Sequence, residues 1–182
     1  MSRLWTYEDY WRYTPPDTFG CEVVDGELIV TPNPSPDHQL VVGEVLMLLY
    51  RFDRDLKLGR CCGRVDVRLD DHNVVSPDLL FVSRDRRHLV GERCIEGAPD
   101  LVVEVFLDWR RGLPQEEARR QLYERFGVRE HWLVDPDACT ITVSSLEDGR
   151  YRPTVYREGD VVRTSLLPGL EVDLTALFAE AA

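Results

Sequence analysis

The chain has 182 residues, of which 43% are hydrophobic and 30% charged, a balance that suits one domain spanning residues 1–182 with a substantial core. Acidic residues outnumber basic ones by 33 to 22, giving a net charge of −11, so the long-range field repels nucleic acid and anionic membranes. A polyanion partner must therefore be bound through a local basic patch. No apolar run approaches the roughly 20 residues that span a bilayer, and the first residues do not resemble a signal peptide. We expect a soluble, cytoplasmic protein.

The cysteines predict no covalent framework. There are five of them, without C-x-x-C spacing, so neither a set of disulfides nor a zinc site is indicated. We expect reduced, mostly buried thiols. The basic residues are nearly all arginine, and Lys57 is the only lysine in the chain.

The first predicted elements are a short helix and a β-hairpin. Thr6 and Asp9 have the spacing of a capping box, which marks the start of the helix. The hairpin has strands at residues 21–24 and 27–31, joined by Asp25–Gly26. This dipeptide tolerates the positive φ angles of a type I′ turn.

A long amphipathic helix is predicted next, from residue 38 to about residue 55, because its apolar residues recur at helical spacing. Asp37 is the expected N-cap, and Gly59 follows the helix end. Strand-like patterns then cover residues 65–69 and the near-continuous apolar run 74–82.

The second half of the chain alternates exposed and buried segments. We expect an exposed excursion at 83–97, buried strands at 100–107 and 131–134, a helix at 115–126, a hairpin at 140–156 and a short last helix. The order helix, three strands, helix, strand, flanked by two hairpins, predicts an α/β fold with a mixed central sheet and helices on its faces.

Two carboxylates interrupt the predicted buried strands. Asp78 and Glu104 each lie among apolar residues, and a buried carboxylate needs a partner because desolvation costs several kcal/mol. If the two strands are neighbours, both carboxylates reach one pocket, where Mg²⁺ or Mn²⁺ is the partner that suits oxygen ligands. The alternative is that each pairs with a buried arginine or accepts hydrogen bonds at a bulge.

The long helix offers two further candidates. Glu44 falls within its apolar stripe and either reaches the same pocket or extends to water at the border of the stripe. His38 follows the expected N-cap and lies near Glu44 by helical phase. It supplies acid–base chemistry or holds a phosphate, or else its hydrogen bond holds the proline-rich connector before the helix in place.

Short sequence blocks follow one another in a fixed order along the chain: EVVDGEL (22–28), PSPDH (34–38), VSPDLLFV (75–82), PDLVVEV (99–105), LY (122–123), FGV (126–128) and EHWLVDP (130–136). In these blocks the chain resembles, from about residue 5 to 175, the Uma-two family of endonucleases, which belongs to the PD-(D/E)XK restriction-endonuclease-like superfamily. The resemblance implies a restriction-endonuclease-like core and a Mg²⁺-dependent phosphodiesterase site. Asp78 and Glu104 would bind the metal, with Glu44 as a supplementary acid.

The expected lysine is missing from this pattern. In the superfamily pattern the lysine lies two residues after the glutamate, and this chain has Phe106 there. In the family variant the lysine lies four residues before the tyrosine of K-x-x-x-Y, and this chain has Arg119 there. Arginine can hold a phosphate but is a poor general base. Two hypotheses follow. The chain is either a metal-dependent endodeoxyribonuclease whose active site has Arg119 where the family pattern has lysine, or a catalytically inactive nuclease fold that acts as a binding or dimerisation module.

Partner surfaces are the last expectation. A local basic patch for a phosphate backbone is predicted from arginines in two segments, namely Arg84, Arg86, Arg87, Arg110, Arg111, Arg119 and Arg120. The alternative is an ordinary solvated charged face. Trp109 beside this patch either stacks on a base or covers the core edge. The exposed hairpin edges predict a homodimer.

Overall fold

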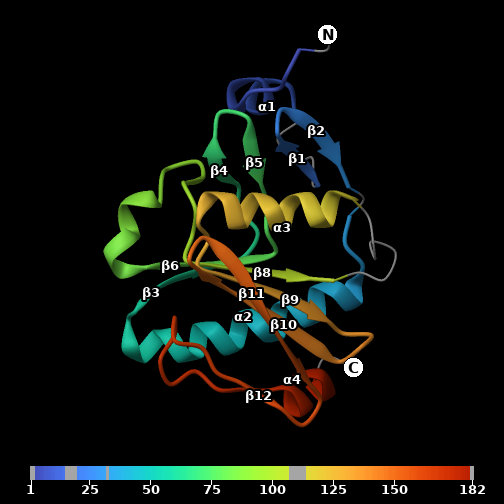
Figure 1. Cartoon of the computed structure of the whole chain (residues 1–182), viewed down its shortest axis with the longest axis vertical. Helices are drawn as coiled ribbons and strands as arrows, with labels where there is room; N and C mark the ends of the chain where they lie inside the picture. Colours follow the sequence, from blue (N-terminus) through green and yellow to red (C-terminus); the bar gives the residue numbers. More distant parts are fainter. Residues whose placement is uncertain (1–2, 15–19, 32, 107–113, 181–182) are drawn as a thin grey trace.

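A computed structural model describes residues 3–14, 20–31, 33–106 and 114–180, and it places helices on both sides of a large mixed sheet (Figure 1). The helices are α1 (Tyr7–Tyr13), α2 (Pro36–Leu56), the 3-10 helix η1 (Arg84–Leu89), α3 (Pro114–Phe126) and α4 (Leu174–Glu180). Across the described ranges, no helix is both long and apolar enough to cross a membrane.

The larger sheet has the strand order β11-β10-β9-β8-β6-β3. Its strands are β3 (Gly59–Cys62), β6 (Leu79–Ser83), β8 (Leu101–Val105), β9 (Glu130–Asp135), β10 (Thr140–Glu147) and β11 (Arg150–Arg157). Only the β8–β9 pair is parallel, because α3 supplies the crossover that a parallel pair requires. The expected α/β fold with a mixed sheet is confirmed.

The second sheet has the order β2-β1-β5-β4-β7. Its strands are β1 (Cys21–Val24), β2 (Glu27–Val30), β4 (Val67–Asp70), β5 (Asn73–Val75) and β7 (Ile95–Glu96), while β12 (Val161–Val162) and β13 (Val172–Asp173) pair separately. The apolar run 74–82 is therefore not one strand, because it leaves this sheet after β5 and enters the larger sheet as β6. Pro77 lies at the crossing, where its missing N–H breaks no ladder.

Two cores lie on opposite faces of the larger sheet. One joins α2 and α4 to that sheet and includes Leu49, Trp132 and Phe178. The other joins α3 and the second sheet to its opposite face and includes Val67 and Tyr123. Figure 1 shows α3 on the side of β1 and β5, and α2 on the far side. Side chains at the start of β6 are therefore within reach of both helices.

The limits of α2 differ from those predicted. Its N-cap is Ser35, not Asp37: the Ser35 hydroxyl accepts a hydrogen bond from the His38 N–H, and Pro36 occupies the first turn. At the other end, Lys57 is the C-cap in the left-handed conformation, with φ 53°. Gly59 is the first residue of β3, a strand that the sequence did not predict. The capping box of Thr6 and Asp9 is confirmed at α1.

Candidate active site

Asp78 and Glu104 lie at one end of a pair of neighbouring strands. Asp78 immediately precedes β6, and Glu104 lies on β8, which pairs antiparallel with β6 in the register Leu79↔Val103 and Leu80↔Val102. The charge of Asp78 raises the pKa of Glu104, so the two carboxylates are close enough to interact. Both side chains are buried, with 7% and 4% of their residue surfaces exposed. Two anionic groups in this position repel unless other groups compensate them.

The Asp78 carboxylate is compensated by hydrogen-bond donors. Its Oδ2 atom lies 3.1 Å from Nε2 of the buried His38 and accepts the Val105 N–H at 2.9 Å. Burial raises the pKa of Asp78, but His38, the Val105 N–H and the positive charge of Arg119 outweigh burial and hold this pKa below its usual value. Asp78 is therefore an ionised carboxylate at neutral pH, and His38 orients it.

Glu104 is in a less favourable environment. Its Oε1 accepts a hydrogen bond of 2.8 Å from the Tyr123 hydroxyl, and its Oε2 lies 3.6 Å from Nη2 of Arg119. Burial raises the pKa of Glu104 to about 8; Arg119 opposes the shift, whereas the charges of Asp78 and Glu22 add to it. The strand pair thus holds one ionised carboxylate beside one that lacks full compensation.

Arg119 is buried on α3 and is held by acids on several elements. Its Nη1 lies 3.1 Å from both carboxylate oxygens of Glu22 on β1, and its Nη2 lies 3.1 Å from the nearer oxygen of Glu116. The charges of Glu104 and Glu22 raise its pKa well above the usual arginine value, although burial opposes this. The guanidinium therefore stays protonated and joins the second sheet to the larger one.

Glu22 is the site residue that sequence reasoning missed. It is only 1% exposed and also accepts the Ser76 N–H at 2.9 Å, next to the segment that carries Asp78. The available signal was a carboxylate within the otherwise apolar strand 21–24. Its partner could not be inferred, because Glu22 and Arg119 are separated by 97 positions in the sequence.

The structure does not bring Glu44 to this cluster. Glu44 is half-buried on α2, six residues after His38, which puts it about 9 Å further along the helix and roughly 120° around it. His38 is the α2 residue that faces Asp78. The expectations for Trp109, Arg110 and Arg111 lie outside the described residues. Arg120 pairs at the surface with Glu117 and Glu124, so it does not extend a basic patch.

The donors present fit a magnesium-type ion better than a closed metal cage. No group of three or more Asp, Glu, His or Cys side chains could hold a metal in the part of the chain that the structure describes. Mg²⁺ requires fewer protein ligands, since proteins commonly bind it through one or two carboxylates together with substrate phosphates and water. Four carboxylates, from Glu22, Asp78, Glu104 and Glu116, interact with the guanidinium of Arg119. Asp78 and Glu104 are thus a suitable pair of oxygen ligands with negative charge in excess.

A cavity of about 480 Å³ gives access to Asp78. Polar residues contribute to its wall beside apolar residues of α2, and its lining consists of Asn33, Pro34, Gln39, Val42, Gly43, Leu46, Gly63, Arg64 and Asp78. A substrate group that enters this cavity meets a carboxylate and an exposed guanidinium together. Phe106, where the superfamily has its lysine, is buried.

Comparisons with known proteins agree with this fold. Residues 7–176 match the Uma2 family, described as "Putative restriction endonuclease". A solved structure, that of a putative nuclease belonging to DUF820 from Anabaena variabilis ATCC 29413, superposes with a TM-score of 0.81 over 97% of this chain and 99% of that one, at 18% identity. No curated protein matches the sequence. The match over nearly the whole length shows that the chain belongs to the Uma2 family of restriction-endonuclease-like proteins.

Proposed function

We propose that the chain is a Mg²⁺- or Mn²⁺-dependent endonuclease that hydrolyses phosphodiester bonds in DNA. The observation that carries the proposal is the pair of buried carboxylates, Asp78 and Glu104, which both interact with Arg119, together with a cavity that reaches Asp78. The family match supports a nuclease in general. A cytoplasmic location would give such an enzyme access to nucleic acid.

The residues of the site would divide the work as follows. Asp78 and Glu104 bind the metal, which when bound polarises the scissile phosphate and lowers the pKa of a coordinated water. His38 orients Asp78 through their contact of 3.1 Å, and Tyr123 orients Glu104 through its hydroxyl. Arg119 remains protonated, so it neutralises charge and cannot take a proton from water.

A second candidate function is favoured by the way in which Arg119 is held. Both terminal nitrogens of its guanidinium face carboxylates, and contact with a phosphate requires one of these ion pairs to open. A catalytically inactive nuclease fold that binds nucleic acid or dimerises would retain this arrangement. Replacing Arg119 with lysine separates the two functions: it raises cleavage if the site is a working nuclease, and the absence of any gain over wild type with metal bound favours the inactive module.

Calorimetric titration of Mn²⁺ tests the metal site directly. Wild type is compared with Asp78→Asn and Glu104→Gln, and each substitution is expected to abolish binding because it removes one of two ligand carboxylates. Asp100→Asn is the matched control. Asp100 is fully buried at the other end of the β6–β8 pair, where it accepts the Ser83 N–H at 2.7 Å, and its loss should leave Mn²⁺ binding intact.

Two outcomes of the titration contradict the proposal. Binding that survives in Asp78→Asn and Glu104→Gln would locate the metal elsewhere. Absence of binding in wild type, both alone and with an oligonucleotide present, would favour the inactive module. The homodimer remains a prediction of its own, and a stable monomer at micromolar concentration in light scattering would refute it.

A further inference from the structure

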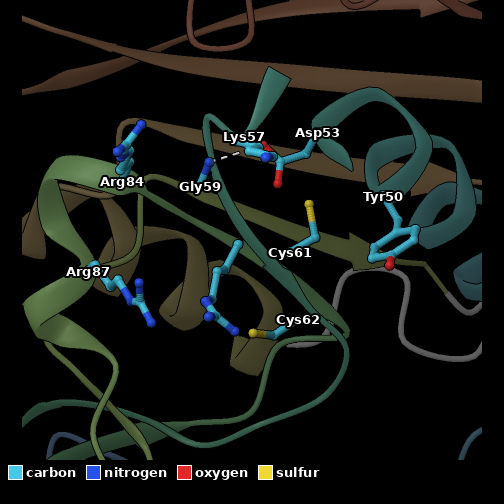
Figure 2. A pocket seen from close by; sticks show the side chains of 9 residues that line it. Tyr50, Asp53, Lys57, Gly59, Cys61, Cys62, Arg84 and Arg87 are labelled. Atoms are coloured by element: carbon cyan, nitrogen blue, oxygen red, sulfur yellow. Dashed lines mark hydrogen bonds between the residues drawn. The ribbon is translucent and has the colours of Figure 1, made fainter. Parts of the chain in front are cut away.

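A second cavity, of about 500 Å³, lies along the edge strand β3. Figure 2 shows it between the end of α2, β3 and η1. Four of its lining residues are basic, and the full set is Tyr50, Asp53, Lys57, Gly59, Arg60, Cys61, Cys62, Arg84 and Arg87. The cavity includes the only lysine of the chain. We call Lys57, Arg60, Arg84 and Arg87 the basic cluster.

The basic cluster lacks the acidic partners that other arginines have. Its four side chains are exposed, and across the described residues none of them forms an ion pair with an acid. Elsewhere, arginines such as Arg68, Arg86 and Arg163 each pair with a carboxylate. The one carboxylate in the described lining, that of Asp53, accepts the Gly59 N–H at 3.0 Å (Figure 2). In a protein of net charge −11, four cations beside a single carboxylate in one hollow leave a local excess of positive charge that can bind anions.

The edge strand connects the basic cluster to the candidate active site. β3 runs antiparallel to β6 from Gly59, opposite Ser83, to Cys62, opposite Leu80. The chain then continues to Gly63 and Arg64, which line the other cavity together with Asp78. At 3.4 Å per residue, β3 itself spans about 10 Å from Gly59 to Cys62, and Gly63 and Arg64 follow it as a bend. Arg64 is also exposed and has no ion pair with an acid in the described ranges.

The backbone of β3 adds further donors along this path. β3 is the last strand in the order of the larger sheet, so within the described residues its outer edge carries no strand partner. An unpaired edge presents backbone N–H groups, which donate hydrogen bonds to anionic oxygens. β3 and the bend that follows it therefore join the two cavities through cationic side chains and backbone donors.

We propose that the phosphodiester backbone of a nucleic-acid strand lies along the β3 edge. In this arrangement, which rests on the proposed nuclease function, the basic cluster binds phosphates on one side of the scissile bond, Arg64 contacts the backbone nearer to it, and the bond itself lies at Asp78 and Glu104. About 10 Å, the length of β3, is the axial length of roughly three nucleotides in one strand of a duplex.

The test compares two double variants with the same net charge. Arg84→Gln with Arg87→Gln removes half of the basic cluster. The control, Arg152→Gln with Arg157→Gln, removes two exposed arginines of β11 that form no ion pair in the described part of the chain and lie at the opposite edge of the same sheet. Binding of a fluorescein-labelled 20-nucleotide single-stranded DNA is measured by anisotropy with Ca²⁺ in place of Mg²⁺, from 0.05 to 0.2 M KCl.

The expected effect follows from counterion release. Each lost phosphate contact lowers the salt slope of a single strand by about 0.7, so two lost contacts lower it by about 1.4 and weaken binding about 25-fold at 0.1 M salt. The control is expected to match wild type within about twofold. Equal affinity of the two double variants, or no affinity of wild type for the 20-mer, overturns the proposal. A dinucleotide that binds as tightly as the 20-mer also overturns it, because the binding site would then be complete with two nucleotides and would not extend along a strand.

Cleavage is assayed separately with Mg²⁺ so that the two proposals fail in different ways. If Arg84→Gln with Arg87→Gln loses affinity but no protein cleaves, the strand path stands and the nuclease function fails. If wild type cleaves and this variant binds and cleaves as the control does, the nuclease function stands and the strand path fails.

Discussion

Replacing Arg119 with methionine tests whether the guanidinium is what stabilises the buried carboxylates. The substitution keeps an unbranched side chain on α3 but removes the charge that faces Glu22, Glu104 and Glu116 at 3.1–3.6 Å. Breaking a buried ion pair by removing one partner costs about 3–5 kcal/mol, since the remaining charge is left uncompensated. For a chain of this size, that corresponds to a melting temperature lower by roughly 6–20 °C.

Urea unfolding followed by circular dichroism at neutral pH measures this loss. Arg120→Met is the matched control: Arg120 is the next residue of the same helix, and its ion pairs with Glu117 and Glu124 are at the surface, where such pairs contribute about 0–1 kcal/mol. Adding Glu22→Gln to Arg119→Met should cost less than the sum of the single changes, because each removes the same interaction. The loss in free energy of unfolding is compared between Arg119→Met and Arg120→Met. If the two losses differ by less than about 1 kcal/mol, the guanidinium of Arg119 does not stabilise the buried carboxylates and our account of the site is refuted.

Three further predictions concern stability. Burial raises the pKa of Asp100, but hydrogen bonds from Ser83 and Arg86 outweigh burial and lower this pKa. Asp100→Asn should therefore reduce the free energy of unfolding by about 1–3 kcal/mol at pH 7. In urea melts, this difference from wild type should shrink as the pH falls below about 4, because the wild-type carboxylate becomes protonated. Gly59→Ala places a Cβ 2.2 Å from the Val82 carbonyl oxygen and should lower the free energy of unfolding by about 1–3 kcal/mol, which a urea melt shows as a lower midpoint. Gly63→Ala has nothing within 4 Å of its Cβ and should keep the wild-type midpoint. Equal midpoints for the two variants would contradict this. Gly43→Ala lies in α2 with open space around its Cβ and should raise the melting temperature through a gain of about 0.5–1 kcal/mol; a lower melting temperature would show that the position is constrained.

Local chemistry made part of the fold predictable from the sequence. The Thr6 and Asp9 spacing, the Asp25–Gly26 turn and the apolar period of α2 each specify structure through residues close in the chain, and all three are found. The N-cap of α2 was wrong because Asp37 and Ser35 are both good caps, and the proline between them fits the first helical turn. β3 was missed because Gly-Arg-Cys-Cys has neither alternation nor a long apolar run.

The candidate site was predictable only in the parts that lie within strands. Apolar neighbours marked Asp78 and Glu104 as buried acids in need of partners, and the structure sets them side by side; their roles as metal ligands remain predictions. Helical phase placed Glu44 near the pocket, but the position that faces Asp78 belongs to His38. The contact of Arg119 with Glu22 depends on how two sheets pack, which no local pattern encodes.

The separation of the site residues along the chain has a consequence for folding order. The acid on β1 and the guanidinium on α3 are 97 residues apart, and contacts of such separation form slowly because the loop between them must first be closed. During synthesis, chains emerge from the N-terminus, so the carboxylates of the first hundred residues are made before the cation that neutralises them. We expect these acids to stay hydrated and apart until α3 docks, so that the arrangement around Asp78 is assembled only after the chain has been made beyond the end of α3 at Phe126.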